Sequence, residues 1–257
     1  MYTNVIPVPK ELELCGSRTQ LLLPDAILVT DPLAEAPAVC FAGYVKKVFD
    51  AEVSVSESSG GICLCREEEL AEGEYRLNCA GDGVHITASD AAGYHYGLSS
   101  LLQLIVHRCE GLSLPLCRIT DHPDCEYRAL MVDVARKKHS LEELLHYVDL
   151  CWLYKIRYFH IHFADTNAYT LPSQVLPELP GAGKHCYTRQ EIDTLVEYAR
   201  SRSIEIIPEI EMPGHCSRMI ATYPERFADT PVDTQSLAER GMYTYNKYHL
   251  CRKARGH

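Results

Sequence analysis

The first half of the chain alternates short apolar runs with polar breaks, a pattern that is typical of short strands. Runs of this kind lie at residues 26–30, 52–56 and 61–65. The stretch EYRLNCAGDGVHITA, residues 74–88, predicts two further strands joined by a turn around Gly81, because glycine and aspartate favour turns.

A helix is expected immediately after this pair of strands, over residues 91–108. Ser89 and Asp90 provide a start signal, and apolar side chains then recur at helical spacing on one face: Leu98, Leu101, Leu102 and Ile105. The strands and this helix together predict a small α+β domain in which helices cover a sheet.

The second half of the chain has a different rhythm. Strands are expected at 127–134, 156–163 and 204–212, where apolar residues dominate. Helices are expected to begin at Ser140 and Thr188, each followed three residues later by a glutamate that would complete a capping box. Strands that alternate with helices in this way predict a parallel α/β sheet.

The composition narrows the classes of partner. The chain has 257 residues and a formal net charge of −10, which argues against nucleic acid and anionic membranes as partners. No run of 18 apolar residues occurs, and the first residues do not read as a secretory signal. Twelve cysteines are scattered without a CxxC motif, which favours thiols in a reducing compartment and predicts a cytoplasmic protein.

Candidate site residues gather where the three strands of the second half end. His160 and His162 share one face of their strand, and Asp165 follows that strand. Arg136 follows the first strand and His215 follows the third. Because parallel strands bring their carboxyl ends to one rim, these side chains are expected to meet there. His160 is expected to be an ordinary core residue.

A metal site is the alternative reading of the same residues. The His-x-His pair and a carboxylate would suit zinc or iron, and a metal-dependent hydrolase would use His160, His162 and Asp165. In metal-dependent amidohydrolase barrels, however, such a pair follows the first strand, whereas here it lies on the second. The sequence therefore predicts no metal and no other cofactor.

Three longer stretches carry a family resemblance. DHPDCEYRALMVDVARKKHSLEELLHYVDLCWLYKIRYFHIHFADT and YTRQEIDTLVEYARSRSIEIIPEIEMPGH resemble the opening of the catalytic barrel of the β-N-acetylhexosaminidases, glycoside hydrolase family twenty. YRLNCAGDGVHITASDAAGYHYGLSSLLQL is similar to the small domain that precedes that barrel. The resemblance covers residues 1–225. It implies an α+β domain over 1–118 and, over 119–257, the first three strand–helix units of a (β/α)8 TIM-type barrel.

The resemblance also implies roles for individual residues. Arg136 would bind ring hydroxyls of a terminal amino sugar, and Asp165 would accept hydrogen bonds from hydroxyls of the same sugar. His215 would lie beside the catalytic acid and orient it. His162 and Glu211 would contact these residues and hold them in position without contacting the sugar. The implied partner is an amino-sugar glycoside, and the oligomeric state stays open.

Two departures from the family pattern affect the expected pocket. This chain has Asp165-Thr166 where the family often has Asp-Asp with a tryptophan downstream, and it has Glu211 where the family more often has aspartate. The residues from about 226 onward also depart from the family pattern. They are expected to form an atypical tail.

The resemblance implies removal of terminal N-acetylglucosamine or N-acetylgalactosamine by substrate-assisted retaining hydrolysis. The acetamido oxygen of the substrate is then the nucleophile, and a glutamate preceded by an aspartate supplies the acid. No Asp-Glu dipeptide occurs in this chain. We therefore expect an N-terminal portion of such an enzyme, without a catalytic residue and inactive alone. A non-catalytic amino-sugar-binding remnant is the alternative.

Overall fold

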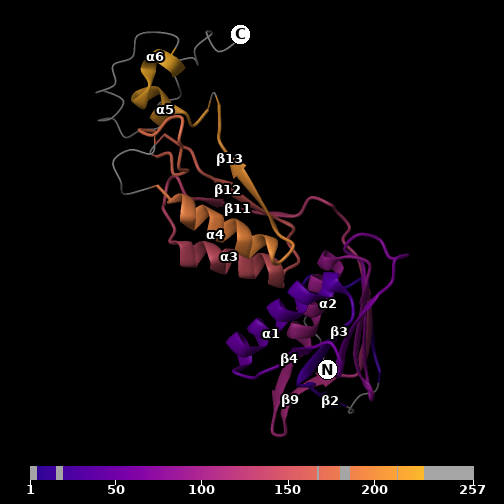
Figure 1. Cartoon of the computed structure of the whole chain (residues 1–257). Helices are drawn as coiled ribbons and strands as arrows, with labels where there is room; N and C mark the ends of the chain where they lie inside the picture. The colour runs from indigo at the N-terminus through magenta and orange to yellow at the C-terminus, as the bar shows by residue number, and fades with distance from the viewer. Residues whose placement is uncertain (1–4, 16–19, 167, 180–185, 213, 229–257) are drawn as a thin grey trace. The chain divides into compact units, whose positions relative to one another are not determined.

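The computed structural model describes residues 5–15, 20–166, 168–179, 186–212 and 214–228 (Figure 1). The chain divides into two compact units. The first unit holds Met1–Arg128, Val148–Arg157 and Tyr198–Ile204, and the second holds Ala129–Tyr147, Tyr158–Glu197 and Glu205–His257.

A mixed seven-stranded sheet forms the centre of the first unit. In the order in which they lie side by side, its strands are β1 (Glu11–Leu14), β10 (Cys117–Asp121), β6 (Tyr75–Ala80), β7 (Gly83–Ala88), β5 (Ile62–Arg66), β3 (Ala26–Val29) and β4 (Ser54–Ser56). The pairs from β1 to β7 are antiparallel. The pairs from β7 to β4 are parallel. Every strand expected in this half from its apolar pattern is confirmed.

Two helices accompany the sheet. They are α1 (Glu35–Phe49), which a short 3-10 turn at Pro32–Ala34 precedes, and α2 (Ala91–Leu104). The start of α2 is confirmed, because the Asp90 carboxylate accepts a hydrogen bond from the Gly93 N–H at 2.8 Å. Gly93 also permits a close approach, since a Cβ there would lie 2.6 Å from the Glu74 carbonyl oxygen. The helix can therefore rest against the backbone of the sheet.

The expected end of this helix at residue 108 is wrong. Ile105 is already extended, and the following residues form the strand β8 (Val106–Arg108), which pairs with β9 (Gly111–Pro115). Gly111 has φ +125°, which permits the tight turn between them. A third strand, β2 (Gln20–Leu22), pairs with β9. The β8–β9 pair is local, whereas β2, which completes this small sheet by pairing with β9, is far away in the sequence.

The strand β10 helps to locate the boundary between the two domains in the sequence. The expected limit at residue 118 falls inside β10, which pairs with β6 along its whole length from Cys117 to Asp121. Because a sheet strand belongs to the domain whose sheet it completes, we propose a limit just after Asp121.

Three parallel strands form the sheet of the second unit. They are β11 (Ala129–Asp133), β12 (Tyr158–His162) and β13 (Glu205–Glu209), with β12 in the middle. The helices α3 (Leu141–Leu153) and α4 (Arg189–Arg200) follow β11 and β12 along the chain. Figure 1 shows the two helices side by side along this sheet. Strand, helix, strand, helix, strand is the expected pattern of a partial barrel, and it is confirmed.

Both expected capping boxes are present. At the start of α3, the Ser140 N–H donates to the Glu143 carboxylate at 2.6 Å and the Glu143 N–H donates to the Ser140 hydroxyl at 3.2 Å. At the start of α4, Thr188 and Glu191 exchange the same two bonds at 2.7 and 3.1 Å. Each box satisfies backbone donors that an α-helix cannot satisfy by itself.

Trp152, near the end of α3, is buried in the core of the first unit. Its ring stacks on Tyr44 at 4.2 Å between centroids, and its indole N–H donates to the Nδ1 atom of His95 at 2.9 Å. Burial holds the pKa of His95 far below its usual value, at about 3. His95 therefore stays neutral and can accept this hydrogen bond.

Two short helices, α5 (Ser217–Thr222) and α6 (Pro224–Phe227), end the described part of the second unit. The atypical tail expected from about residue 226 lies outside the described residues from position 229 onward. None of the eleven cysteines in the described ranges forms a disulfide. Within the same ranges, no helix has both the length and the apolar character that a membrane crossing requires.

Candidate functional site

The candidate site lies at the carboxyl ends of the three parallel strands of the second unit. Asp133, His162 and Glu209 are the last residues of β11, β12 and β13, and they stand opposite one another in the sheet register. Polar side chains at the same level of adjacent parallel strands must either pair or face a ligand, because leaving them unpaired in a buried place costs free energy. All five predicted site residues lie at this rim.

Asp133 holds Arg136 in place. One carboxylate oxygen of Asp133 accepts hydrogen bonds from the backbone N–H groups of Ala135 and Arg136, both at 3.0 Å. The other oxygen forms an ion pair with the Arg136 guanidinium at 2.6 Å. The sequence analysis did not select Asp133, although its place at a strand end, three residues before an arginine, was a usable signal. The turn therefore fixes where the guanidinium can reach.

Arg136 and Asp165 are brought together as predicted. Nη2 of Arg136 lies 2.6 Å from an oxygen of Asp165, whose side chain is 5% exposed. The Thr166 N–H donates to this carboxylate, and Nδ1 of His215 lies 3.2 Å from it. Burial by itself would raise the pKa of Asp165, but these hydrogen bonds and the Arg136 charge outweigh burial and lower it. Asp165 is therefore an ionised acceptor at neutral pH.

His215 reaches the same carboxylate from the loop after β13. Its Nδ1 atom lies 3.2 Å from Asp165, and its Nε2 atom lies 3.4 Å from Glu211. His215 has φ +50°, a conformation that is uncommon for residues other than glycine. This backbone conformation turns the imidazole back over the end of the sheet. His215 and Glu211 are thus neighbours, as expected.

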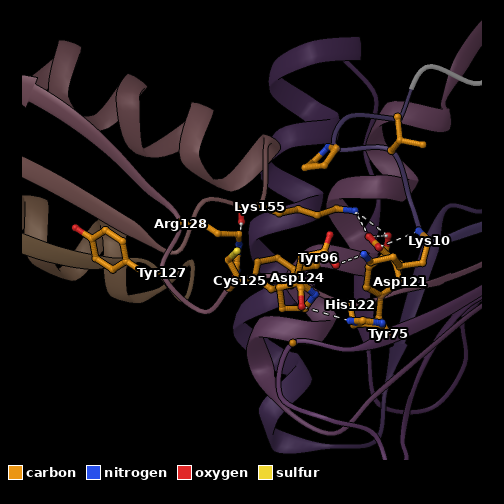
Figure 2. A pocket seen from close by; sticks show the side chains of 14 residues that line it. Lys10, Tyr75, Tyr96, Asp121, His122, Asp124, Cys125, Tyr127, Arg128 and Lys155 are labelled. Carbon is orange, nitrogen blue, oxygen red and sulfur yellow. Dashed lines mark hydrogen bonds and ion pairs between the residues drawn. The ribbon is translucent and has the colours of Figure 1, made fainter.

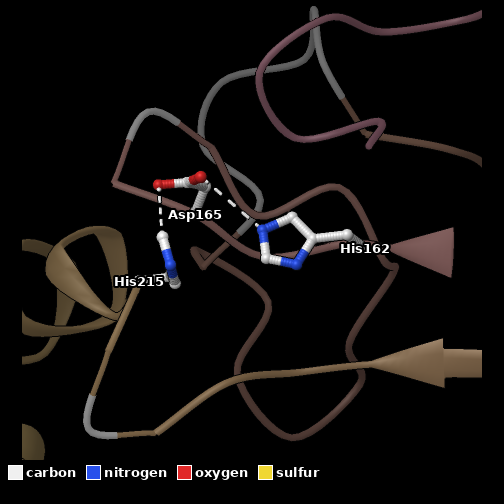
Figure 3. Close-up of side chains that lie close together, drawn as sticks. All are labelled: His162, Asp165 and His215. Carbon is white, nitrogen blue, oxygen red and sulfur yellow. Dashed lines mark hydrogen bonds and ion pairs between the residues drawn. The ribbon is translucent and has the colours of Figure 1, made fainter. Parts of the chain in front are cut away.

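His162 is buried behind Asp165 (Figure 3). Its Nδ1 atom lies 3.0 Å from Glu209, while its Nε2 atom faces Asp165 at 3.6 Å and has no hydrogen-bond partner. The rings of His162 and His215 meet edge to face at 5.5 Å. His162 therefore presents one satisfied nitrogen to the sheet and one unsatisfied nitrogen to the site.

The sequence places Glu209 near the end of its strand but assigns it no role in the site. Its carboxylate lies 2.7 Å from Nε2 of His160 and 3.0 Å from Nδ1 of His162, so it bridges the His-x-His pair. It also shares a hydrogen bond with Glu211, which raises the pKa of the Glu211 carboxyl. His160 is thus held within the sheet rather than turned toward Asp165.

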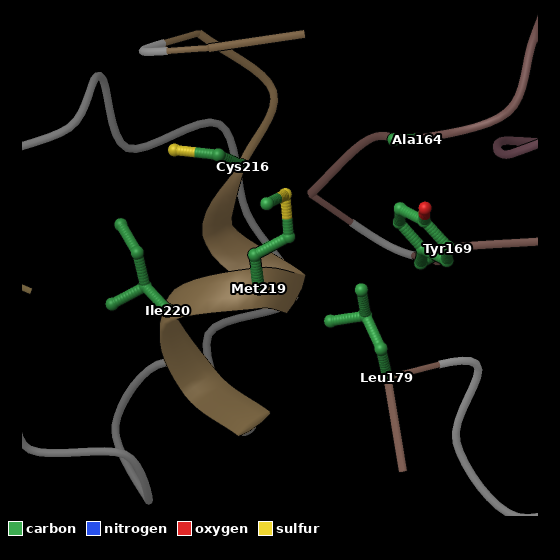
Figure 4. Close-up of a cluster of buried hydrophobic side chains, with 6 residues drawn as sticks. All are labelled: Ala164, Tyr169, Leu179, Cys216, Met219 and Ile220. Carbon is green, nitrogen blue, oxygen red and sulfur yellow. The ribbon is translucent and has the colours of Figure 1, made fainter. Parts of the chain in front are cut away.

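An apolar cluster fixes the two loops that carry Asp165 and His215. The cluster contains the residues just beside them, Ala164 and Cys216 (Figure 4). The other buried members are Tyr169, Leu179, Met219 and Ile220. Because a close-packed cluster resists displacement of its members, it holds the two loops against each other.

Among the residues that the structure describes, two sets of side chains have donor atoms close enough for one metal ion. They are His162, Asp165 and His215, and alternatively His162, Glu209 and Glu211, with donor atoms within 4.8 Å of one another in each set. The metal alternative from the sequence required His160 beside Asp165. That set is not among those assembled by the described residues, because His160 pairs with Glu209.

A separate cavity of about 360 Å³ lies in the first unit, and none of the predicted site residues lines it (Figure 2). Its wall contains a buried ion pair between Lys155 and Asp121 at 2.8 Å. Tyr75 completes the group, since its hydroxyl oxygen accepts from Lys155 at 2.8 Å and its O–H lies 3.1 Å from Asp121. Because these groups satisfy one another, they present no unpaired polar atom to a ligand.

Comparison with known proteins agrees with this architecture. The family model "Glycosyl hydrolase family 20, domain 2" matches residues 2–122, and "Glycosyl hydrolase family 20, catalytic domain" matches residues 125–254. An α+β domain followed by the first strands of a barrel fits the solved structures of this class, such as an N-acetyl-beta-hexosaminidase of Streptomyces plicatus, with a TM-score of 0.82 at 27% identity over 97% of this chain. The chain belongs to glycosyl hydrolase family 20.

Particular relatives and structures are similar over most of the chain. A beta-hexosaminidase of Porphyromonas gingivalis is 28% identical over 246 residues, which cover 86% of this chain and 32% of the relative. One from Akkermansia muciniphila is 36% identical over 190 residues, which cover 66% of this chain and 38% of the relative.

Among solved structures, the GH20 β-N-acetylhexosaminidase of Streptomyces coelicolor has a TM-score of 0.81 at 28% identity and covers 97% of this chain. The exo β-N-acetylglucosaminidase of Vibrio harveyi, solved with N-acetylglucosamine, has a TM-score of 0.83 at 25% identity and covers 90%. This chain spans 53% and 39% of those two chains.

Proposed function

We propose that this chain supplies the sugar-binding part of a β-N-acetylhexosaminidase site, and that it takes a terminal N-acetylglucosamine or N-acetylgalactosamine. The observation that carries the proposal is the pair formed by Arg136 and Asp165, 2.6 Å apart at the strand ends. It pairs a multi-donor cation with an ionised acceptor, which matches the two hydrogen-bonding capacities of adjacent sugar hydroxyls.

The guanidinium of Arg136 is half exposed, with 52% of its side chain open to solvent. It can therefore donate hydrogen bonds to ring oxygens while Asp133 continues to hold its other nitrogen. Asp165 would accept from a hydroxyl of the same ring. The V. harveyi relative was solved with N-acetylglucosamine, which supports this class of ligand.

His215 would act through its neighbours. It lies between Asp165 and Glu211, with one ring nitrogen near each carboxylate. A change of charge on one carboxylate can therefore affect the other through the imidazole. Its imidazole is 40% exposed, and we propose that it orients the group that protonates the leaving oxygen. His162 and Glu211 would hold Asp165 and His215 in the geometry described above.

The hydrolytic step requires an acid that this sequence does not identify. In substrate-assisted retaining hydrolysis the acetamido oxygen attacks the anomeric carbon, and an acid protonates the leaving oxygen. Because the chain contains no Asp-Glu dipeptide, we propose that it binds the sugar but does not hydrolyse a glycoside by itself. The family activity then describes the whole protein rather than this segment.

Further parts of the proposal concern partners and location. The net charge of −10 does not favour nucleic acid or an anionic membrane surface as a partner. Cys65, Cys109 and Cys125 are exposed, and exposed thiols persist only in a reducing environment, so we propose a cytoplasmic location. Thiol titration of the protein as isolated from cells should find these cysteines reduced.

The test is a titration of the chain with N-acetylglucosamine. Protein NMR spectra recorded during the titration give the dissociation constant. Arg136→Ala should weaken binding by tenfold or more, because it removes the donor fork. Arg189→Ala is the matched control, since Arg189 is an exposed arginine on α4 that pairs with Asp193, and it should change nothing. Equal affinities for the wild type and Arg136→Ala would contradict the proposal.

Hydrolysis is measured separately with an aryl N-acetyl-β-glucosaminide. We expect no chromophore release above the rate of buffer. Release by the purified chain would show that it contains an acid outside the Asp-Glu pattern.

A further inference from the structure

The unsatisfied nitrogen of His162 is the starting observation. Its side chain is 4% exposed, and its Nδ1 atom is engaged by the Glu209 carboxylate at 3.0 Å. A carboxylate accepts only from a protonated nitrogen, so Nδ1 carries a proton, and in the neutral ring Nε2 keeps its lone pair. That lone pair faces Oδ2 of Asp165 at 3.6 Å; Nε2 of His162 has no hydrogen-bond partner, whereas Oδ2 forms an ion pair with the Arg136 guanidinium at 2.6 Å. An imidazole nitrogen and a carboxylate oxygen that face each other in a buried place can bind a metal cation between them.

His215 repeats this arrangement from the other side. Its Nε2 atom is oriented by Glu211 at 3.4 Å, and its Nδ1 atom lies 3.2 Å from the second oxygen of Asp165. Each imidazole thus has a carboxylate on the nitrogen that faces away from Asp165. Metal-binding histidines in proteins are held in this way, because the carboxylate fixes the ring and raises the basicity of the free nitrogen.

The spacing of the donor atoms suits a small divalent cation. With zinc–nitrogen bonds of about 2.0–2.1 Å, ligands of a tetrahedral ion lie about 3.3 Å apart. The two separations from Asp165 are 3.6 Å to His162 and 3.2 Å to His215, and all three donors lie within 4.8 Å of one another. Two imidazoles and one carboxylate leave room for solvent or substrate oxygen on the ion.

Arg136 already places a positive charge beside this position. Its Nη2 atom lies 2.6 Å from Asp165 and 3.5 Å from Nδ1 of His215. Its side chain is half exposed and keeps a second ion pair with Asp133, so it can leave Asp165 without losing every partner. The guanidinium and a metal ion would therefore compete for the same carboxylate.

We propose that His162, Asp165 and His215 form a Zn²⁺ site that Arg136 closes in the absence of metal. This differs from the expectation that the chain holds no metal. The metal site does not depend on the proposed function. The predicted effect of zinc on sugar binding does depend on the proposed function. Zinc would bind Asp165 and His215, which are proposed to bind the sugar and to orient the acid, and would exclude the sugar from them.

The test uses Co²⁺ as a spectroscopic probe, added to the full chain after treatment with a chelator. We expect visible ligand-field bands that saturate at one ion per chain and disappear on addition of Zn²⁺. Thiolate ligands would instead give a strong near-ultraviolet charge-transfer band. Such a band, or an absence of saturable binding, would overturn the proposal, since the chain has 12 cysteines that offer another site.

Three variants make the assignment specific. His215→Ala should weaken Co²⁺ binding at least tenfold, whereas His146→Ala, an exposed histidine on α3, should change it less than twofold. Arg136→Ala should strengthen binding, because it removes the competing cation. A variant that merely disturbed the fold would weaken binding, so a weaker or unchanged affinity of Arg136→Ala would overturn the proposal. Far-ultraviolet circular dichroism checks that each variant is folded.

A final titration separates the two proposals. If both hold, N-acetylglucosamine raises the apparent dissociation constant for Co²⁺. Saturable Co²⁺ binding that ignores the sugar supports the metal site and counts against the proposed overlap with the sugar site.

Discussion

The two units of the chain both bury charged side chains, and they do so in opposite ways. In the first unit, Lys155 and Asp121 are both less than a tenth exposed, and Tyr75 completes their hydrogen bonding. In the second unit, His162 and Asp165 are equally buried, yet Nε2 of His162 lacks a hydrogen-bond partner and the nearby oxygen of Asp165 pairs with the half-exposed Arg136. A closed group of buried charges is structural, whereas a buried group with unsatisfied atoms is ready for a ligand.

The largest effect is expected from the closed group. Asp121→Ala should cost about 3–5 kcal/mol of unfolding free energy, because Lys155 would remain buried without its partner. Burial already lowers the pKa of Lys155 against the raising effect of Asp121, so removal of Asp121 leaves only the unfavourable contribution. Urea unfolding measures this cost.

Asp124→Ala is the control for that variant, since Asp124 forms an exposed ion pair with Lys10. It should leave the unfolding midpoint unchanged. If the urea unfolding midpoint of Asp121→Ala were close to the wild-type value, the buried pair of Lys155 and Asp121 would not be the structural group that the comparison with the second unit requires.

The second effect concerns ligand binding rather than stability. Asp165→Asn keeps the shape of the side chain but removes its charge, so affinity for N-acetylglucosamine should fall by about ten- to a hundredfold, or ~1.4–2.7 kcal/mol. Stability should change little, because Arg136 and His215 can turn to solvent. Calorimetric titration measures the affinity, and a stability loss as large as that of Asp121→Ala would contradict the comparison.

A smaller effect is expected from pH. Burial would raise the pKa of Asp149, but hydrogen bonds from Lys47, Tyr44 and Tyr198 outweigh burial and lower it. The unfolded chain therefore binds this proton more readily. The resulting stability is fully present above the usual aspartate pKa of about 4, and it is lost as pH falls through the lower folded value.

Asp149→Asn should accordingly remove about 1 kcal/mol at neutral pH and flatten the acid limb of the stability curve. Thermal unfolding between pH 2 and 7 tests this expectation. Asp193→Asn serves as the comparison, because Asp193 is exposed on α4, where it pairs with Arg189. An unchanged acid limb in Asp149→Asn would show that other groups control it.

The smallest effect is expected from Glu211→Asp. This change restores the residue that the family more often has, and a carboxylate one methylene shorter can still face His215. The dissociation constant for N-acetylglucosamine should change less than threefold in the same titration. A larger loss would mean that the reach of Glu211 toward His215, 3.4 Å in this chain, sets the pocket.

Local signals in the sequence predicted most of the second unit. The capping boxes at Ser140 and Thr188 fix the helix starts, and the apolar runs fix all three strands. They work because the interactions that define these boundaries lie within four residues. The strand rule that side chains at i and i+2 share a face likewise placed His160 and His162 together.

Nonlocal pairing set the limits of prediction. β1 is four residues long and pairs with β10, about a hundred positions away, so neither reads clearly alone. The role of His160 also required the structure, because only the register of β12 against β13 shows that Glu209 lies between the two histidines. Asp133 is different, because its place at a strand end three residues before Arg136 was a local signal in the sequence.

The first unit is discontinuous in the chain, and this affects how the protein is made. It includes Val148–Arg157 and Tyr198–Ile204, although most of it ends at Arg128. The ribosome adds about 5–20 residues per second, so the N-terminal segment waits several seconds before its last piece is synthesised. During that interval Asp121 and His95 lack the partners that Lys155 and Trp152 later supply. The first unit is therefore the first to be synthesised but is completed late. Until then its incomplete core is exposed on the nascent chain, where a chaperone would bind.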